Sequence, residues 1–280
     1  MKRSFEVKWF LFGAVTAMAV AGAAWFVMKP VPKTPSAPTS SAQPTDATLS
    51  PVSLAEAVLA SDAPGCGASA TYVTIAPEAQ LPAHVRNAIN ARITEVAVSF
   101  FAGPGDDMTP PPDTVEEAMG KWSSLCQESQ GESVGDGYDA AWYNTLSYSV
   151  SLNNGSVLSI GLHDEVFEGG THPNGWNDYL TFDLQTGKEW LLEDVVTSEH
   201  RVVFAEQLAT RLLGMRDVLY EETISELERY LADPRAENLD LVLSKGWKYS
   251  LTENTITIHY NPYQIAPYVA GPIDIELPRP

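Results

Sequence analysis

Apolar residues at helical spacing predict two long helices in the first half of the chain. The first helix is marked by a stripe of five residues: Val85, Ile89, Ile93, Val96 and Phe100. Residues three or four apart lie on one face of an α-helix, so we expect an amphipathic helix over 82–101. After a Gly- and Pro-rich segment, Asp113 and Glu116 match a capping box, which predicts the start of a second helix. A short β-branched run over 70–76 precedes both helices and predicts a strand.

From residue 138 onward the pattern changes to the alternation that is typical of β-strands. Apolar residues alternate with serines over 147–152, and the Asn-Asn-Gly that follows is a strong signal for a hairpin turn. We therefore expect the chain to return antiparallel over 157–162. A further strand is expected over 178–184, beyond the glycine-rich loop 169–175.

Two more helices and three more strands are predicted in the second half of the chain. Apolar residues at helical spacing mark helices over 198–215 and 217–232, the first with Ser198 as its N-cap. The last strands are expected over 247–251, 255–260 and 272–277. Because helices and strands are segregated in the sequence, the predicted fold class is α+β: an antiparallel sheet of hairpins with helices packed on one face.

An apolar run over 9–28 dominates the N-terminal region. Its length matches the thickness of a bilayer core, which favours a transmembrane anchor, but small residues near its middle also resemble a signal-peptide cleavage site. Both alternatives place the rest of the chain outside the cytoplasm. We expect a bacterial inner-membrane protein with a periplasmic or extracytoplasmic domain, or a protein secreted after cleavage.

The remaining segments divide the chain further. Residues 1–8 are expected to form a short cytoplasmic stub, with its basic residues on the inner side of the membrane. Residues 29–52 are rich in Pro, Ser and Thr and predict a flexible linker, because they cannot bury enough apolar surface to fold. The exported part is expected to have an N-terminal strand-and-helix region over 53–135 and a C-terminal domain over 136–280.

The net charge bears on the possible partners, and the number of cysteines bears on a disulfide. The formal net charge is −19, which disfavours nucleic-acid binding. It would attract a cationic partner, and the alternative is that the acidic surface serves solubility alone. The chain has two cysteines, Cys66 and Cys126, and an even number in an oxidising compartment predicts one disulfide.

Two long motifs identify a family. The first is GGTHPN followed by YLTFDLQTGKEWLLED, and the second is WKYSLTENTITIHYNPYQIAPYVAGPIDIELP. Together they resemble the RsiV-type C-terminal domain, a family of unknown function that occurs in lysozyme-sensing anti-sigma factors and beside the catalytic domain of some peptidoglycan deacetylases. The resemblance covers about 138–278. It implies an extracytoplasmic α+β module, whereas the short stub and the lack of a catalytic domain lead us to expect neither anti-sigma nor deacetylase activity.

The glycine-rich loop and the Pro-Tyr segment contain the candidate binding residues. We predict ligand contacts from five side chains: His172, Asn174, Trp176, Asp178 and Tyr263. Aromatic rings offer contact area at a low cost in conformational entropy. A structural role is the alternative, in which the glycines allow a tight turn and His172 stabilises it by hydrogen bonding.

No catalytic or metal-ligating residues are predicted. His163, Asp164 and Glu165 lie close to His172 in sequence, but their spacing matches no common zinc motif, and strand alternation separates the first two. The sequence also contains no common hydrolase or phosphate-loop motif. No cofactor is therefore expected.

The leading hypothesis is a membrane-tethered domain that binds a cell-envelope ligand without catalysis. The expected partners are a cationic protein such as a lysozyme, or a peptidoglycan fragment, together with the inner membrane through the N-terminal helix. An enzyme that modifies cell-wall glycan and a structural assembly factor of the envelope remain as alternatives.

Overall fold

The computed structural model describes residues 50–102, 112–132, 141–243 and 247–280. The predicted stub, the anchor or signal peptide and residues 29–49 of the linker lie outside the described residues. In the ranges that are described, none of the helices has the length and apolar character needed to cross a membrane.

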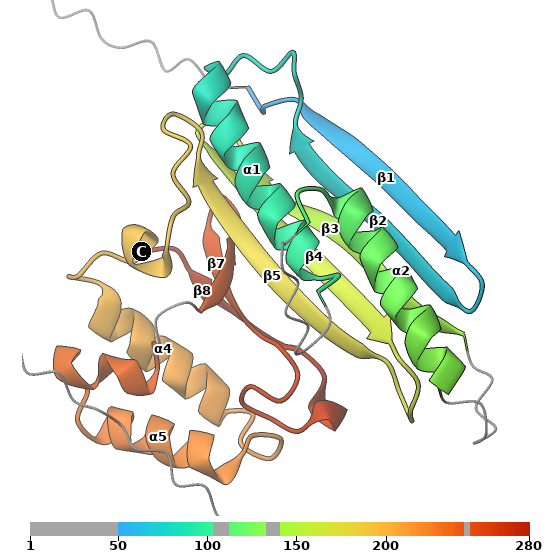
Figure 1. Cartoon of the computed structure of the whole chain (residues 1–280). Helices are drawn as coiled ribbons and strands as arrows, with labels where there is room; N and C mark the ends of the chain where they lie inside the picture. Colours follow the sequence, from blue (N-terminus) through green and yellow to red (C-terminus); the bar gives the residue numbers. More distant parts are fainter. Residues whose placement is uncertain (1–49, 103–111, 133–140, 244–246) are drawn as a thin grey trace, which may run out of the picture. The chain divides into compact units, whose positions relative to one another are not determined.

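A five-stranded sheet contains strands from both predicted parts of the exported region (Figure 1). In sheet order its strands are β1 (Leu54–Ala63), β2 (Cys66–Ile75), β3 (Trp142–Asn153), β4 (Val157–Phe167) and β5 (Asn174–Asp183). Neighbouring strands are antiparallel except β2 and β3, which are parallel. A parallel pair needs a long crossover connection, and the two helices between β2 and β3 provide it. The hairpin between β3 and β4 is confirmed, whereas β1 was not anticipated.

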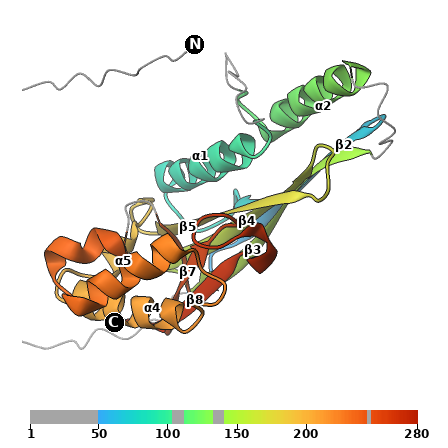
Figure 2. The same cartoon turned by 90° about the horizontal axis from the view of Figure 1, so that it is seen from below.

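Helices α1 (Ala83–Ser99) and α2 (Val115–Glu132) cover one face of this sheet (Figure 2). The predicted stripe of α1 is confirmed, since Val85, Ile89 and Ile93 are fully buried in the same core as residues of β4 and β5. The N-cap of α2 lies one residue later than predicted. Thr114 Oγ1 accepts a hydrogen bond from the Glu117 backbone N–H at 3.2 Å, and Asp113 is not the cap.

The predicted disulfide between Cys66 and Cys126 is confirmed. It joins β2 to α2, with the two Cα atoms 5.9 Å apart, and both residues belong to the buried core. A cross-link that closes a loop of about 60 residues stabilises a fold by roughly 4 kcal/mol in the chain-entropy model.

The second half of the chain forms a smaller core around a three-stranded sheet. Its elements are α3 (Leu192–Val195), α4 (Arg201–Leu213), α5 (Glu221–Ala232), the 3₁₀ helices η1 (Ala236–Leu241) and η2 (Tyr268–Ala270), and the antiparallel strands β6 (Lys248–Leu251), β7 (Thr255–Tyr260) and β8 (Ile273–Pro278). The apolar side of α4 packs against β8, and α5 packs against α4 and η1 around the same buried core. Ser198 is not the cap of α4, because the helix begins at Arg201 after His200 and has no side-chain cap.

The three-stranded sheet lies across the face of the larger sheet that α1 and α2 leave open, as Figure 2 shows for β7 and β8. The Leu251 backbone N–H donates a hydrogen bond to Ser159 Oγ at 3.0 Å, which links β6 directly to β4. Ser159 in turn contacts Thr181 Oγ1 at 3.0 Å. Small hydroxyl side chains on β4 and β5 therefore let the two sheets approach closely, and the predicted α+β class is confirmed.

Candidate functional site

The glycine-rich loop between β4 and β5 contacts a second loop, residues 261–272, through stacked rings. The His172 ring lies flat on the Tyr268 ring, with centroids 3.9 Å apart and an interplanar angle of 14°. The Tyr268 hydroxyl donates a hydrogen bond to the Pro173 carbonyl oxygen at 2.5 Å. Gly169 makes the path possible, because it has φ +85° and a Cβ there would lie 3.2 Å from Trp142 Nε1.

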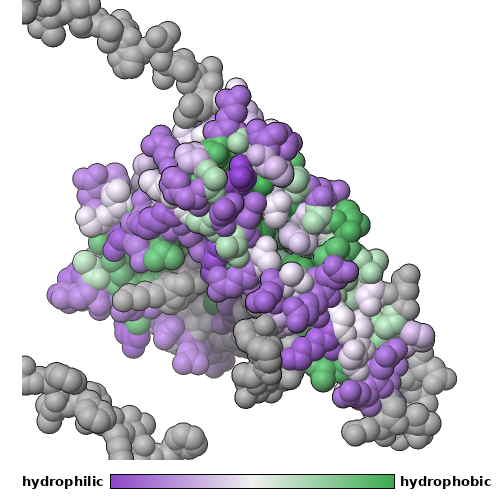
Figure 3. All heavy atoms as spheres, turned by 45° about the horizontal axis from the view of Figure 1, so that its top comes forward, coloured by the Kyte–Doolittle hydropathy of each residue, from purple (hydrophilic) through white to green (hydrophobic). Residues whose placement is uncertain are grey.

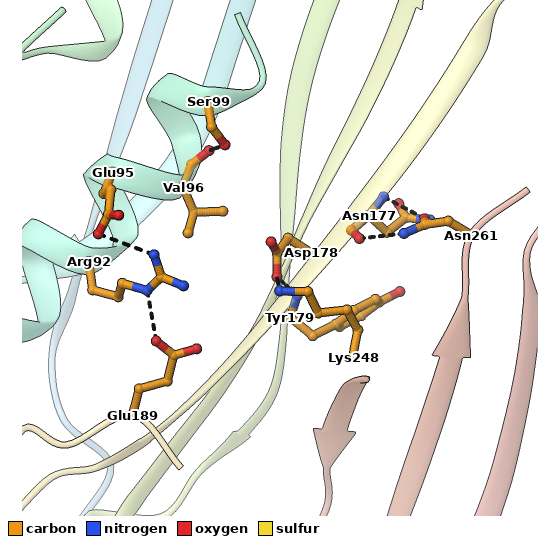
Figure 4. Close-up of polar contacts among 10 residues, drawn as sticks. All are labelled: Arg92, Glu95, Val96, Ser99, Asn177, Asp178, Tyr179, Glu189, Lys248 and Asn261. Atoms are coloured by element: carbon orange, nitrogen blue, oxygen red, sulfur yellow. Dashed lines mark hydrogen bonds and ion pairs between the residues drawn. The ribbon is translucent and has the colours of Figure 1, made fainter. Parts of the chain in front are cut away.

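One buried asparagine anchors the second loop to the larger sheet (Figure 4). Asn261 Oδ1 accepts a hydrogen bond from the Asn177 backbone N–H at 2.7 Å, and Asn261 Nδ2 donates one to the Asn177 carbonyl oxygen at 2.9 Å. The side-chain amide therefore pairs with the backbone of β5 as a neighbouring strand does. Asn261 is only 5% exposed, so these two hydrogen bonds are shielded from water and hold the second loop against β5.

Tyr263 adopts a backbone conformation that is rare for a tyrosine. Its φ is +68°, and it is the only residue other than glycine with a positive φ among the described residues. This left-handed region costs roughly 1–2 kcal/mol for a residue with a Cβ. The side chain is nevertheless 58% exposed, with its ring 5.6 Å from Tyr268. Packing does not explain a strained backbone at an exposed aromatic residue. Residues with such backbone strain are often found at binding surfaces.

The two loops border a surface hollow of about 380 Å³. Asp164 and Glu165 contribute to its lining from β4, Asn174 from β5, and Tyr268 and Val269 from the second loop. Acidic, amide, phenolic and apolar residues therefore border one hollow, with the side chains of the neighbouring strand residues Asp164 and Glu165 on opposite faces of β4. We call this hollow, together with His172, Tyr263 and Glu168, the loop junction.

Asp164 has an unusual environment within the loop junction. Burial, and secondarily the nearby carboxylates of Glu168 and Glu165, raise the pKa of Asp164 from its usual 3.8 to about 8. Its Oδ1 is buried and has no hydrogen-bond partner among the residues that the structure describes. None of the ion pairs within the described ranges includes Asp164, Glu165 or Glu168. Asp164 therefore keeps its proton at neutral pH, beside two acidic side chains that have no counterion from the described part of the chain.

A second polar cluster joins β5 to the three-stranded sheet. Lys248 Nζ lies 2.5 Å from Asp178 Oδ1, and Figure 4 shows this pair beside Tyr179. The Tyr179 ring stacks on His259, with centroids 3.5 Å apart and an interplanar angle of 4°. Burial, and secondarily the charge of Asp274, raise the pKa of Tyr179 well above its usual value. Asp178 is therefore engaged in holding the two sheets together.

His259 also forms part of a hydrogen-bonded chain of the serine–histidine–aspartate type. Ser250 Oγ lies 2.8 Å from His259 Nε2, and Asp274 Oδ1 lies 2.8 Å from His259 Nδ1. A nucleophilic serine has to be open to its substrate, whereas Ser250 is 8% exposed and the Tyr179 ring covers His259. This arrangement fits a structural contact between the sheets better than a catalytic triad.

The five predicted ligand contacts fall into two groups. His172, Asn174 and Tyr263 all belong to the loop junction. Trp176 lies opposite Asp164 in the strand pairing and is 46% exposed, while Asp178 pairs with Lys248 at the sheet contact. The predicted hydrogen-bonding role of His172 is limited to its Nδ1, which lies 2.9 Å from the carbonyl oxygen of the adjacent Pro173.

Several important residues were not in the predicted set. Asn261 and Tyr268 position the second loop, and Asp164 lines the hollow. The Asn-Pro-Tyr and Ala-Pro-Tyr motifs signalled a constrained loop, but no sequence signal indicated that Asp164 would lack a partner. No group of three potential metal ligands occurs in the part of the chain that the structure describes.

Comparison with known proteins gives a family match for one segment of the chain and a solved structure with a similar fold. No curated protein matches the chain. A crystal structure of a DUF3298 family member from Bacteroides fragilis is similar with a TM-score of 0.55 and 16% identity, covering 81% of this chain and 90% of that chain. A DUF3298 family protein from Pseudomonas aeruginosa PAO1 has a TM-score of 0.49 and 14% identity over 81% and 91% of the two chains.

The likeness to the Bacteroides fragilis structure concerns the fold alone. Within the sequence, residues 215–280 match the family model described as a protein of unknown function (DUF3298). This segment holds α5, the three-stranded sheet and the second loop of the junction. The RsiV-type assignment expected from the motifs is not confirmed, and the sequence comparison supports only a broader statement: residues 215–280 are similar to the DUF3298 family, whose function is unknown.

Proposed function

We propose that this chain is a membrane-tethered envelope protein that binds a cationic protein ligand at the loop junction, without catalysing a reaction. Lysozyme represents the class of ligand, as the family resemblance suggests. The observation that carries the proposal is the cluster of Asp164, Glu165 and Glu168, which has no counterion among the described residues. A lysine or arginine side chain of a partner would supply the missing positive charge beside Glu165 and Glu168, and it would favour ionisation of Asp164, which keeps its proton at neutral pH in the free chain.

Exposed apolar and aromatic groups beside the carboxylates support a protein partner. Tyr263 is 58% exposed, Trp176 is 46% exposed and Val269 is 93% exposed. Tyrosine and tryptophan are over-represented among the residues that dominate binding energies at protein interfaces. The flat ring of Tyr263 can also contact a cation directly. Exposed aromatic residues therefore lie next to acidic residues at the loop junction.

The proposed location follows from the sequence and is consistent with the disulfide. The apolar run 9–28 would hold the chain in the inner membrane, and the linker 29–52 would hold the folded part away from the lipid. A disulfide such as Cys66–Cys126 persists in oxidising compartments and is rare in the cytosol. An extracytoplasmic position would expose the loop junction to soluble envelope proteins.

Two other ligand or activity classes fit the structure less well. Peptidoglycan fragments carry carboxylates of their own, so the three acidic groups of the junction disfavour them. An enzyme acting on cell-wall glycan through His172 would need an accessible imidazole. His172 is exposed, but Tyr268 covers one face of its ring and its Nδ1 is turned to Pro173, so only part of the imidazole is open to a substrate. Unchanged turnover of muropeptides after His172→Ala, or no turnover at all, would remove this alternative.

Calorimetric titration of the full chain with lysozyme tests the proposal. Binding is expected at an ionic strength of about 0.01 M, where the Debye length is about 30 Å, and should weaken strongly at about 1 M, where it is about 3 Å. The double variant Glu165→Gln/Glu168→Gln should lower the affinity at least tenfold. Glu78→Gln/Glu128→Gln makes the same charge change at exposed positions outside the junction and should have little effect.

Three results would contradict the proposal. One is an absence of binding at low salt, which would favour an assembly role without this ligand. Another is an equal loss of affinity in both double variants, which would mean that only the net charge of the chain attracts lysozyme. The third is binding of a muropeptide that survives both substitutions and high salt.

A further inference from the structure

Strand β1 forms an open edge of the five-stranded sheet. It pairs with β2 along its whole length, from Leu54 opposite Ile75 to Ala63 opposite Cys66, without a shift of register. On its other side, no strand of the described residues pairs with it. Figure 1 shows β1 as the outermost strand, with α1 and α2 covering only the face of the sheet. Ten residues of edge backbone are therefore available for pairing.

The sequence of β1 has few of the features that protect an edge strand. Natural edges are commonly blocked by proline, lysine or a bulge, and the segment LAEAVLASDA contains no proline or lysine and forms no bulge. Val58, near its middle, is 67% exposed. Figure 3 shows hydrophobic side chains gathered along the side of the molecule where Figure 1 places β1. Such an edge favours pairing with another strand.

The direction of the free backbone groups follows from the pairing with β2. The Ser53 carbonyl oxygen accepts a hydrogen bond from the Ala76 N–H at 3.0 Å, so the backbone groups of residue 53 point towards β2. In an antiparallel pair, alternate residues point to opposite sides. The even-numbered residues from Leu54 to Asp62 therefore direct both their N–H and C=O groups away from β2.

We propose that a second copy of this chain pairs with β1 in antiparallel fashion, with Val58 on the two-fold axis. This register places Leu54 opposite Asp62 and Glu56 opposite Ala60, so that no two acidic residues face each other. It uses nine residues of each strand and joins the two sheets into one of ten strands. An axis at Leu59 would use the same length but would place Glu56 opposite Asp62, and like charges directly opposite are destabilising. An axis at Ala57 would pair a shorter stretch.

The dimer is expected to be weak in free solution. An interface made mainly by one strand pair is smaller than the roughly 1,600 Å² of a standard protein interface. Each copy also carries a formal net charge of −19, which opposes association. Salt screens this repulsion, so the dimer fraction should increase with ionic strength. This is the opposite of the salt dependence expected for a cationic ligand at the loop junction, so the two interactions can be distinguished.

Cysteine cross-linking of the full chain tests the proposed register. Val58→Cys should form a disulfide-linked dimer, because directly opposite residues in a hydrogen-bonded antiparallel pair have Cα atoms about 5.5 Å apart. Glu56→Cys should not cross-link to itself, because the two copies of residue 56 would be roughly 14 Å apart along the strands. A mixture of Glu56→Cys and Ala60→Cys should give the mixed dimer. Thiol counting checks that Cys66–Cys126 stays intact.

The control is Glu128→Cys, an exposed position on α2 that reports chance collisions. We expect at least tenfold more dimer from Val58→Cys than from Glu128→Cys, and more at high salt than at low salt. Val58→Lys in the chain with native cysteines should shift sedimentation towards the monomer. Equal cross-linking at residues 56, 58 and 128, or a monomer at every salt concentration for Val58→Cys, would overturn the proposal.

Discussion

Replacing Asp164 by asparagine should remove a pH-dependent penalty on folding. In the folded chain, burial and then the carboxylates of Glu168 and Glu165 raise the pKa of Asp164 to about 8, whereas the usual value is 3.8. The native state therefore holds a proton on Asp164 between pH 4 and 8, and the unfolded chain does not. Because the native state binds more protons in this window, the free energy of unfolding falls as the pH rises.

The size of this effect follows from the shift in pKa. Each unit corresponds to about 1.4 kcal/mol at 25 °C, so the full window gives an upper bound of about 6 kcal/mol. The contribution of Asp164 to stability is complete below pH 4 and is lost as the pH rises towards 8. Asparagine has nearly the same shape and does not ionise, so the variant should lack this loss.

Urea unfolding of the full chain and of Asp164→Asn, at several pH values between about 4 and 9, measures the difference directly. The difference in unfolding free energy should be constant near pH 4 and should change by several kcal/mol in favour of the variant by pH 8. Any fixed cost of the new amide cancels in this comparison, because it does not depend on pH. Parallel curves for the two chains across the window would refute the assigned environment of Asp164.

Three further variants test other contacts by urea unfolding at neutral pH. Tyr263→Gly should raise the free energy of unfolding by about 1 kcal/mol, because glycine relieves the left-handed backbone, while lysozyme affinity should fall more than tenfold. A lower stability would contradict the strain. Cys66→Ala with Cys126→Ala should cost about 4 kcal/mol, and no change would contradict the disulfide. Asn261→Ala should cost roughly 2–3 kcal/mol through its two backbone hydrogen bonds, and an unchanged midpoint would contradict that anchor.

The elements with strong local signals were predictable from the sequence. The stripe from Val85 to Val96 has full helical periodicity, and α1 buries that stripe. The Asn-Asn-Gly turn gave the hairpin between β3 and β4 for a similar reason, since local turn chemistry decides the pairing. The pairing of Cys66 with Cys126 followed from their being the only two cysteines.

Features that depend on distant parts of the chain were not predictable in the same way. Strand β1 has a weak alternation and begins directly after the linker, so its pairing with β2 gave no clear local signal. The parallel pairing of β2 with β3 depends on the two intervening helices. Within the candidate site, His172 and Tyr268 are far apart in sequence, and their stacking depends on how Asn261 fixes the second loop.

Proton release on ligand binding tests the central claim most directly. If a lysozyme side chain brings a positive charge to the loop junction, the pKa of Asp164 must fall, and its proton must be released near pH 7. Calorimetric titrations in two buffers with different ionisation enthalpies measure this release. The full chain should release close to one proton more per complex than Asp164→Asn does. Equal proton release by the two chains, or an absence of binding by both, would contradict the account.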